Sequence, residues 1–416
     1  MFSRFKSNSD LNAEQVADAR QYIDGFWSRL TRHNAKGDQS LIGLPHPYIV
    51  PAFTKGEAFH FEEMYYWDTY FILQGLLVPK YKTLAVGMVD NLLYVYNKLS
   101  IIPNANRSYL TGRSQPPLLT SMIWDVYQAF DLDKSWLDRA IDVALREYHN
   151  VWIGESKPHI RRVFSGLSRY YDINHVHDLA EAESGWDMTT RFSRKALDYL
   201  PVDLNALLYK YEKDFAEYFK LCDDKESAQK WLALANQRSQ EMRKLMWSAT
   251  RGLYMDYNYQ KQKRSNISSL ASFYPMWVGM VDDDQAAAMV KALKSRFEKK
   301  GGLSTTDMPF AGKNPGPVPA QWAYPNGWAP LHFIVVQGLE RYGFSKDARR
   351  ITMKWLATNL QWFEQNQQFL EKYNVVNPSK EPARGLYPAQ TGFGWTNAVF
   401  ERLCKDYIDA NKQTNV

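Results

Sequence analysis

The hydrophobic residues of this chain recur with a helical period along nearly all of its 416 residues. In residues 11–32, for example, Val16, Ile23 and Leu30 fall on one side of a helical wheel and charged residues fall on the other. The same period predicts further helices at about residues 64–77, 84–99, 116–130, 134–149, 203–222, 225–247, 270–281, 284–299, 328–342, 346–366 and 395–410. Strand-like alternation is rare, so the pattern predicts an all-α fold.

The connections between these helices indicate how the helices are arranged. They carry Gly, Pro and Asn residues, as at 102–106 and 311–319, and no linker or change of composition divides the chain. No motif repeats at the spacing of about 34 or 40 residues that is typical of α-solenoids, which disfavours stacked repeats. We therefore expect helical hairpins packed around one centre, as in an (α/α) toroid, and a single domain over residues 1–416.

Charge and cysteine content exclude several classes of protein. The 51 Lys and Arg residues exceed the 45 Asp and Glu residues by six and are spread along the chain, which argues against nucleic-acid binding. Two cysteines, Cys222 and Cys404, are too few for a disulfide framework or a Cys/His zinc set. The apolar runs are too short to span a membrane. Residues 1–10 contain no signal-peptide core, so we expect a cytoplasmic protein.

The chain is rich in aromatic residues, with 14 Trp, 26 Tyr and 21 Phe. Many of them stand beside carboxylates in five segments that are dense in Gly, Pro and polar residues: 59–71, 102–117, 181–192, 320–330 and 371–397. A pyranose has an apolar face that stacks on rings and a rim of hydroxyls that needs hydrogen-bond partners. If the helical array closes, these segments gather at one mouth and predict a sugar-binding cavity.

Each segment also has a structural interpretation. The rings of residues 59–71 could belong to the core, with Glu62 and Glu63 at a solvated edge. Arg107 and Arg113 could each hold an internal carboxylate, although we favour a functional role for Arg113. Glu371 could lie in a charged surface turn. A metal at His175 and His177 is disfavoured, because a His-x-His pair without a third placed ligand is more often incidental.

The five segments resemble the signature segments of the trehalase family of glycoside hydrolases. The resemblance covers residues 20–405 with the motifs in the same order, and it is closest in residues 102–117 and 183–187. It implies an (α/α)6 barrel with catalytic loops at one mouth. The implied reaction is hydrolysis of an α-linked glucoside with inversion, without metal or cofactor.

Inversion requires a protonated carboxyl and an ionised carboxyl, about 6.5–9.5 Å apart, so that water fits between the base and the sugar. The resemblance places the acid at Asp187, in Ser-Gly-Trp-Asp, and the base at Glu371, in Glu-Lys-Tyr. An apolar setting beside Trp186 should raise the pKa of Asp187, whereas Glu371 needs a polar shell to stay ionised. The expected substrate-binding residues are His60, Phe61, Trp67, Asp68, Asn104, Arg113, Ser114, Gln115, Gly185, Trp186, Gln321, Trp322, Trp328 and Trp395.

The chain departs from the family pattern at several positions. His60 replaces an arginine, Ala323 an aspartate and Leu386 a glutamate, and a second family arginine has no counterpart before Glu183. The leaving-group side could therefore differ. Three interpretations stay open: a trehalase, which we favour; an inverting α-glycosidase for another small glycoside, such as glucosylglycerate or mannosylglycerate; and a sugar-binding pseudoenzyme. For a glycerate, His60, His175 and Arg384 would be the cations to examine.

The expected partners follow from this interpretation. We expect a small sugar substrate, no nucleic acid and no membrane, and a monomer or weak homo-oligomer.

Overall fold

The computed structural model describes residues 11–53, 60–157, 160–308, 320–385 and 389–410. Its α-helices are α1 Ala13–Leu30, α2 Tyr66–Leu73, α3 Lys82–Leu99, α4 Leu119–Phe130, α5 Lys134–Glu147, α6 His177–Glu183, α7 Val202–Leu221, α8 Lys225–Met246, α9 Tyr274–Trp277, α10 Asp283–Ala292, α11 Ala329–Arg341, α12 Ser345–Asn366 and α13 Gly394–Cys404. Short 3₁₀ and π segments are η1 Pro79–Tyr81, η2 Ser108–Leu110, η3 Tyr148–Trp152, η4 Ala196–Asp198, η5 Leu270–Phe273, η6 Leu293–Phe297 and η7 Lys405–Asp409.

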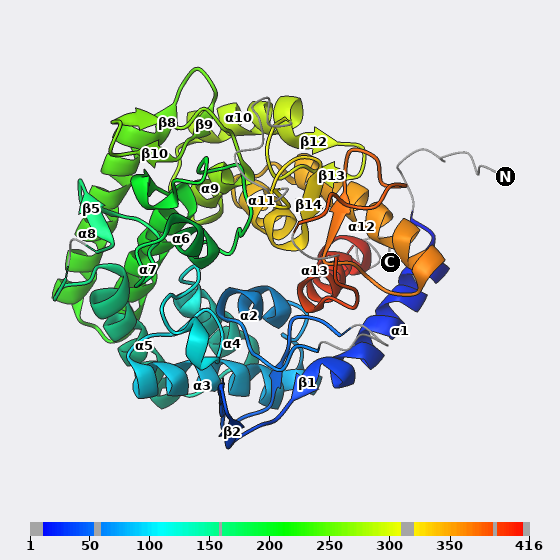
Figure 1. Cartoon of the computed structure of the whole chain (residues 1–416), viewed down its shortest axis with the longest axis horizontal. Helices are drawn as coiled ribbons and strands as arrows, with labels where there is room; N and C mark the ends of the chain where they lie inside the picture. Colours follow the sequence, from blue (N-terminus) through cyan, green and yellow to red (C-terminus); the bar gives the residue numbers. More distant parts are fainter. Residues whose placement is uncertain (1–10, 54–59, 158–159, 309–319, 386–388, 411–416) are drawn as a thin grey trace.

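The helices form two concentric rings (Figure 1). Neighbouring inner helices contact one another in the order α2, α4, α7, α9, α11 and α13, and α13 returns to α2, so the inner ring is closed. Figure 1 shows α1, α3, α5, α8, α10 and α12 around the outside. The fold is therefore an (α/α)6 barrel, and the prediction of a closed helical array is confirmed.

Sequence composition explains which helices are inside. All eight residues of α2 are buried, and all but Asp68 and Thr69 are aromatic or aliphatic, as expected of a helix that is enclosed by its neighbours. The outer helix α8 instead buries one stripe at helical spacing, which includes Ala228, Ala235 and Met242, and exposes its charged face. The inner ring thus fills the centre with rings and aliphatic side chains, while the outer ring carries most of the solvent contact.

The strands are short and serve to hold loops together. They are β1 Thr31–Arg32, β2 Gly37–Asp38, β3 Leu41–Ile42, β4 Tyr48–Ile49, β5 Arg162–Phe164, β6 Leu167–Ser168, β7 Tyr199–Leu200, β8 Trp247–Ser248, β9 Leu253–Tyr254, β10 Tyr257–Asn258, β11 Lys263–Arg264, β12 Glu298–Lys299, β13 Gly302–Leu303, β14 Asn326–Trp328 and β15 Lys372–Asn374. The antiparallel pair β14–β15 sets Trp328 opposite Lys372. This pair joins two segments that are far apart in sequence.

Most predicted helices are found with small shifts at their ends. The helix predicted at 270–281 is instead the 3₁₀ segment η5 followed by the four-residue α9, and those predicted at 284–299 and 395–410 end as the π segments η6 and η7. The predicted helix at 64–77 is shorter, because Tyr65 is extended and the chain turns after Leu73. One helix was missed: α6 lies in a stretch read as a loop. Its seven residues span only two turns, which is too short for a period to be recognised.

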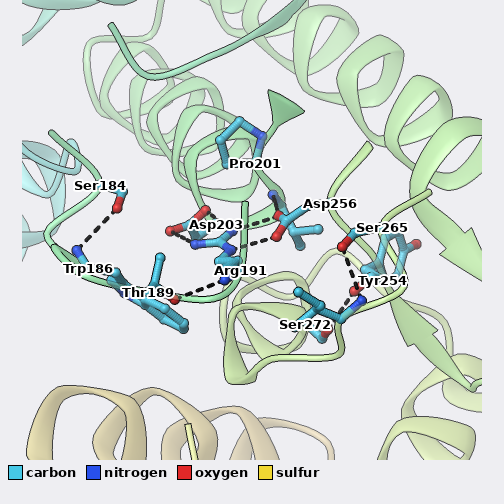
Figure 2. Close-up of polar contacts among 12 residues, drawn as sticks. Ser184, Trp186, Thr189, Arg191, Pro201, Asp203, Tyr254, Asp256, Ser265 and Ser272 are labelled. Carbon is cyan, nitrogen blue, oxygen red and sulfur yellow. Dashed lines mark hydrogen bonds and ion pairs between the residues drawn. The ribbon is translucent and has the colours of Figure 1, made fainter. Parts of the chain in front are cut away.

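A buried arginine anchors the loop after α6 to the start of α7 (Figure 2). Arg191 is fully buried, and its guanidinium lies 2.6 Å from an oxygen of Asp203 and 2.6 Å from an oxygen of Asp256. Asp256 also accepts a hydrogen bond from the backbone N–H of Val202, 2.9 Å away. The guanidinium packs over the ring of Trp186 at 4.8 Å. These contacts fix the loop that carries Asp187.

Replacement of Arg191 by methionine should destabilise the protein strongly. Two buried carboxyls would lose their cation, and breaking a buried ion pair costs about 3–5 kcal/mol. The measurement is the free energy of unfolding in urea. The matched control is Arg146→Met, which removes an exposed pair with Asp142 and should cost less than about 1 kcal/mol. Equal losses in the two variants would contradict this account of the loop.

Candidate active site

The five aromatic and acidic segments meet at one cavity of about 450 Å³. This volume lies in the range of about 300–1,000 Å³ that is typical of small-molecule sites. The lining residues come from all five segments and from the loop after β4: Pro51, Phe61, Tyr65, Trp67, Asp68, Asn104, Leu110, Arg113, Gln115, Ala182, Gly185, Asp187, Trp322, Glu371, Gln390, Phe393 and Trp395. The prediction that these segments gather at one place is confirmed.

Indole rings form one wall of the cavity. Trp67, Trp322 and Trp395 line it, and their ring centroids lie 5.6–6.1 Å apart. Behind Trp322, the ring of Trp328 stacks in parallel at 3.7 Å, and Trp186 stacks on Trp322 at 5.5 Å. The wall is therefore two rings deep at Trp322, which leaves the indoles that face the cavity little freedom to move.

Gly185 lets the Asp187 loop approach this wall. Its φ is +74°, and a Cβ at this position would lie 2.6 Å from the ring of Trp67. Any side chain would therefore collide with the indole, and the left-handed backbone also favours glycine. The glycine thus brings Asp187 to the cavity.

Asp187 is half-buried and faces the cavity. Burial raises the pKa of its carboxyl, and the positive charge of Lys372 acts in the opposite direction. The carboxyl accepts hydrogen bonds from the side chains of Gln321, at 3.4 Å, and Trp322. The raised pKa agrees with the expectation for this residue and suits a carboxyl that has to carry a proton.

Glu371 approaches the cavity from the segment before β15. Its backbone N–H donates to the Gln390 carbonyl at 2.9 Å, and its carbonyl accepts from the Trp395 indole at 3.1 Å. The pKa of the Glu371 carboxyl is raised overall, because burial and the charge of Asp187 outweigh the charge of Lys372 and its 2.6 Å hydrogen bond, which lower it. The polar shell expected around Glu371 is therefore largely one ammonium group.

A third carboxyl, Asp68, lies in the first turn of α2. Burial, with a smaller effect from the charges of Glu371 and Asp187, raises its pKa to about 8. Three acids thus line one cavity, and their negative charges oppose one another. At neutral pH such a group favours at least one protonated carboxyl.

The polar side of the cavity comes from residues 102–117. Gln115 accepts a hydrogen bond from the backbone N–H of Trp67 at 3.0 Å, which ties this segment to the start of α2. Arg113 contacts Asp172 at 3.2 Å, while its buried Nε has no hydrogen-bond partner among the described residues. Arg113 therefore pairs with an internal carboxylate and also lines the cavity. The structural and the functional interpretation of Arg113 are thus compatible. The other candidate of this segment, Arg107, pairs with Glu63 and takes the structural role.

Five of the predicted binding residues do not line the cavity. His60 is exposed and stacks on Phe53 at 5.1 Å. Ser114 is fully buried, and its polar groups are already paired: its hydroxyl donates to the Ile102 carbonyl and its backbone N–H donates to Glu183. Trp186, Gln321 and Trp328 stand behind the wall, where they are covered by Trp322 and Asp187. The cavity lining therefore does not include these five residues, and their part in substrate binding stays a prediction.

Several lining residues were not predicted. The missed residues Tyr65, Leu110, Ala182, Gln390 and Phe393 lie inside the predicted segments, and that position was the signal available for them. Pro51 lies outside every predicted segment. Lys372 was quoted only as part of a motif, although it contacts Glu371 directly.

The remaining candidates lie away from the cavity lining. His175 packs near Tyr171, His177 accepts from the Leu197 N–H, and Arg384 pairs with Glu381 at the surface. Leu386 lies outside the described residues. In the part of the chain that the structure describes, no group of three or more His, Cys, Asp or Glu residues is arranged to hold a metal ion. None of the described helices has both the length and the hydropathy to cross a membrane.

Comparison with known proteins assigns the chain to a family. A sequence profile named Trehalase matches residues 2–179 and 172–407. A periplasmic trehalase of Xanthomonas campestris pv. campestris is 33% identical over 93% of this chain and 73% of its own length. A periplasmic trehalase of Shigella flexneri serotype 5b is 32% identical over 91% of this chain and 72% of its own length.

Solved structures agree with the sequence comparison. The neutral trehalase of Saccharomyces cerevisiae superposes with a TM-score of 0.78 at 27% identity, over 95% of this chain and 81% of that chain. A mannosylglycerate hydrolase of Thermus thermophilus superposes with a TM-score of 0.67 at 16% identity, over 92% of this chain and 99% of that chain. At such low identity the second likeness shows the fold alone.

The same relatives correct one prediction. A cytoplasmic location was expected from residues 1–10, but the curated relatives are named periplasmic trehalases, which points to the periplasm. The expectation failed because it rested only on the lack of a signal-peptide core in residues 1–10. These residues lie outside the described part of the chain. With the profile spanning nearly the whole length and the signature loops joined at one cavity, the chain belongs to the trehalase family of glycoside hydrolases.

Proposed function

We propose that this protein hydrolyses trehalose to two glucose molecules with inversion at the attacked anomeric carbon. Asp187 is the general acid and Glu371 is the general base. The observation that carries the proposal is the pair of carboxyls, Asp187 half-buried and Glu371 buried, facing one indole-lined cavity in a chain of this family. Inverting hydrolysis needs two such groups and no covalent intermediate.

The surroundings of the two carboxyls support these roles. Lys372 contacts Glu371 directly at 2.6 Å, whereas Asp187 accepts its hydrogen bonds from the neutral side chains of Gln321 and Trp322. A contacting ammonium favours the ionised form of its partner more strongly than a distant one does. Glu371 is therefore the carboxyl that ionises first, and Asp187 is the one that retains a proton for the leaving oxygen.

The cavity wall supports a sugar as the substrate. Trp67, Trp322 and Trp395 offer flat apolar faces, and Asp68, Asn104 and Gln115 offer hydrogen-bond partners at the rim. A pyranose ring needs both kinds of contact. We also propose that residues 1–416 form one catalytic domain, which is supported by a single hydrophobic cluster that includes residues of both rings of helices.

The position of the cations favours trehalose over a glycoside of glycerate. A glycerate carboxylate would require a cation in the cavity, and His60, His175 and Arg384 are not among the lining residues. Arg113 does line the cavity but already faces Asp172. An uncharged second sugar is the better match for this wall.

The substrate is tested with a panel of trehalose, kojibiose, maltose, glucosylglycerate and mannosylglycerate. We expect release of glucose from trehalose with kcat/KM at least about tenfold above that of any other member. Release of glucose or mannose is measured by coupled assay. Fast turnover of a glycerate glycoside without trehalose hydrolysis would overturn the proposed substrate but not the glycosidase activity.

The two catalytic roles are tested with Asp187→Asn and Glu371→Gln. Each variant keeps the shape of the side chain and removes its titration, so kcat on trehalose should fall by about 10²–10⁴-fold while sugar binding stays near that of the wild type. Binding is measured by calorimetry with trehalose. The control is Asp178→Asn, an exposed carboxyl of α6 that should leave kcat unchanged. Near-wild-type turnover in either catalytic variant would refute its assignment.

A further inference from the structure

Lys372 is a fully buried lysine next to the proposed base. It is the first residue of β15, and the β14–β15 register sets it opposite Trp328. Its Nζ donates to Glu371 Oε2 at 2.6 Å and to Gln321 Oε1 at 2.9 Å, and it lies 4.9 Å from the centre of the Trp328 ring. The ammonium thus touches a carboxylate, an amide oxygen and an aromatic face.

The contact with Lys372 determines how the Gln321 amide is oriented. An ammonium group can only donate hydrogen bonds, so the oxygen of the amide must face Lys372. The NH₂ group then points the other way, toward Asp187 Oδ2 at 3.4 Å. Glu371, Lys372, Gln321 and Asp187 therefore form one continuous chain of hydrogen bonds from the proposed base to the proposed acid, which we call the acid–base bridge.

Stability does not explain why this bridge contains a buried charge. Replacing a buried ion pair by apolar residues is often neutral or stabilising, so the pair by itself argues weakly for a structural role. Both ends of the bridge are instead carboxyls that line the cavity. The backbone of Gln321 is also held in place, because its backbone carbonyl accepts a hydrogen bond from Asn326 Nδ2 at 2.9 Å.

We propose that Lys372 is a positioning residue that holds Glu371 in the charge state and orientation of a general base and, through Gln321, sets the amide group that faces Asp187. This inference rests on the proposed function. Lys372 itself does not line the cavity, so it acts through the groups that it contacts. The bridge makes the placement of each carboxyl depend on the other.

The charged groups around the bridge fix the direction of the expected pH effect. Glu371 interacts with Lys372 and Asp187. The charge of Glu371 also raises the pKa of Asp68. Asp187 also interacts with Arg113, and its charge raises the pKa of Glu181. Among these groups Lys372 is the cation in contact with Glu371. Its removal leaves burial and the charge of Asp187, which raise the pKa of Glu371, opposed by the backbone hydrogen bond from Gln390. Activity that needs ionised Glu371 is lost as the pH falls through that pKa.

The test compares Lys372→Met with Lys372→Arg. In Lys372→Met, the acid limb of kcat/KM on trehalose should move to higher pH by at least about one unit, and kcat at neutral pH should fall by about 100-fold with KM changed less than about threefold. Lys372→Arg retains the charge and should keep the acid limb of the wild type. Lys354→Met is the control, because it removes an ion pair of the same 2.6 Å length on the outer helix α12 and should leave the profile unchanged.

Two further variants keep the result interpretable. Gln321→Met interrupts the bridge without removing charge, and should lower kcat by about tenfold without moving the acid limb. If Lys372→Met does not fold, Lys372→Met combined with Glu371→Gln should fold, because no buried carboxylate is left unpaired. Failure of the double variant to fold would assign Lys372 a purely structural role and overturn the proposal.

The outcomes separate this inference from the proposed function. A wild-type protein without trehalose hydrolysis, or an active Glu371→Gln variant, would contradict the proposed function. Trehalose hydrolysis by the wild type together with an unchanged pH profile in Lys372→Met would contradict only the role of Lys372.

Discussion

A stack of three indoles with a cation at each end holds the parts of this site together. Arg191 packs over Trp186 at 4.8 Å, Trp186 stacks on Trp322, Trp322 stacks on Trp328 at 3.7 Å, and Lys372 lies over Trp328 at 4.9 Å. The stack crosses three segments that are distant in sequence. Because its layers are rigid rings in contact, it holds the Asp187 loop and the strand after Glu371 in a constant relation.

The ends of this stack are also where the charges are placed. Arg191 is fully paired with Asp203 and Asp256 and serves the loop, whereas Lys372 reaches Glu371 and the Gln321 amide. Burial raises the pKa of both Asp187 and Glu371, and the ammonium opposes this effect most directly at Glu371. One lysine thus distinguishes two carboxyls that share a cavity and would otherwise compete for the same proton.

The sequence predicted the helices and the meeting of the loops better than the details of the wall. Long amphipathic stretches such as α8 have a clear period, and loops rich in Gly and Trp are recognisable without a structure. Which side of a loop faces the cavity depends on pairings such as β14–β15, and these are set by contacts between distant segments. For that reason Trp186 and Trp328 were misplaced and Lys372 was overlooked, and the two-turn helix α6 gave too little period to detect.

In the proposed reaction two carboxyls, one protonated and one ionised, hydrolyse an α-linked disaccharide by direct attack of water. Proton NMR of the first turnovers on trehalose tests this most directly, because it distinguishes the anomers before mutarotation. Inversion at one carbon predicts α- and β-glucose in equal amounts at the earliest times. Initial release of α-glucose alone would indicate retention through a covalent intermediate and would contradict the account.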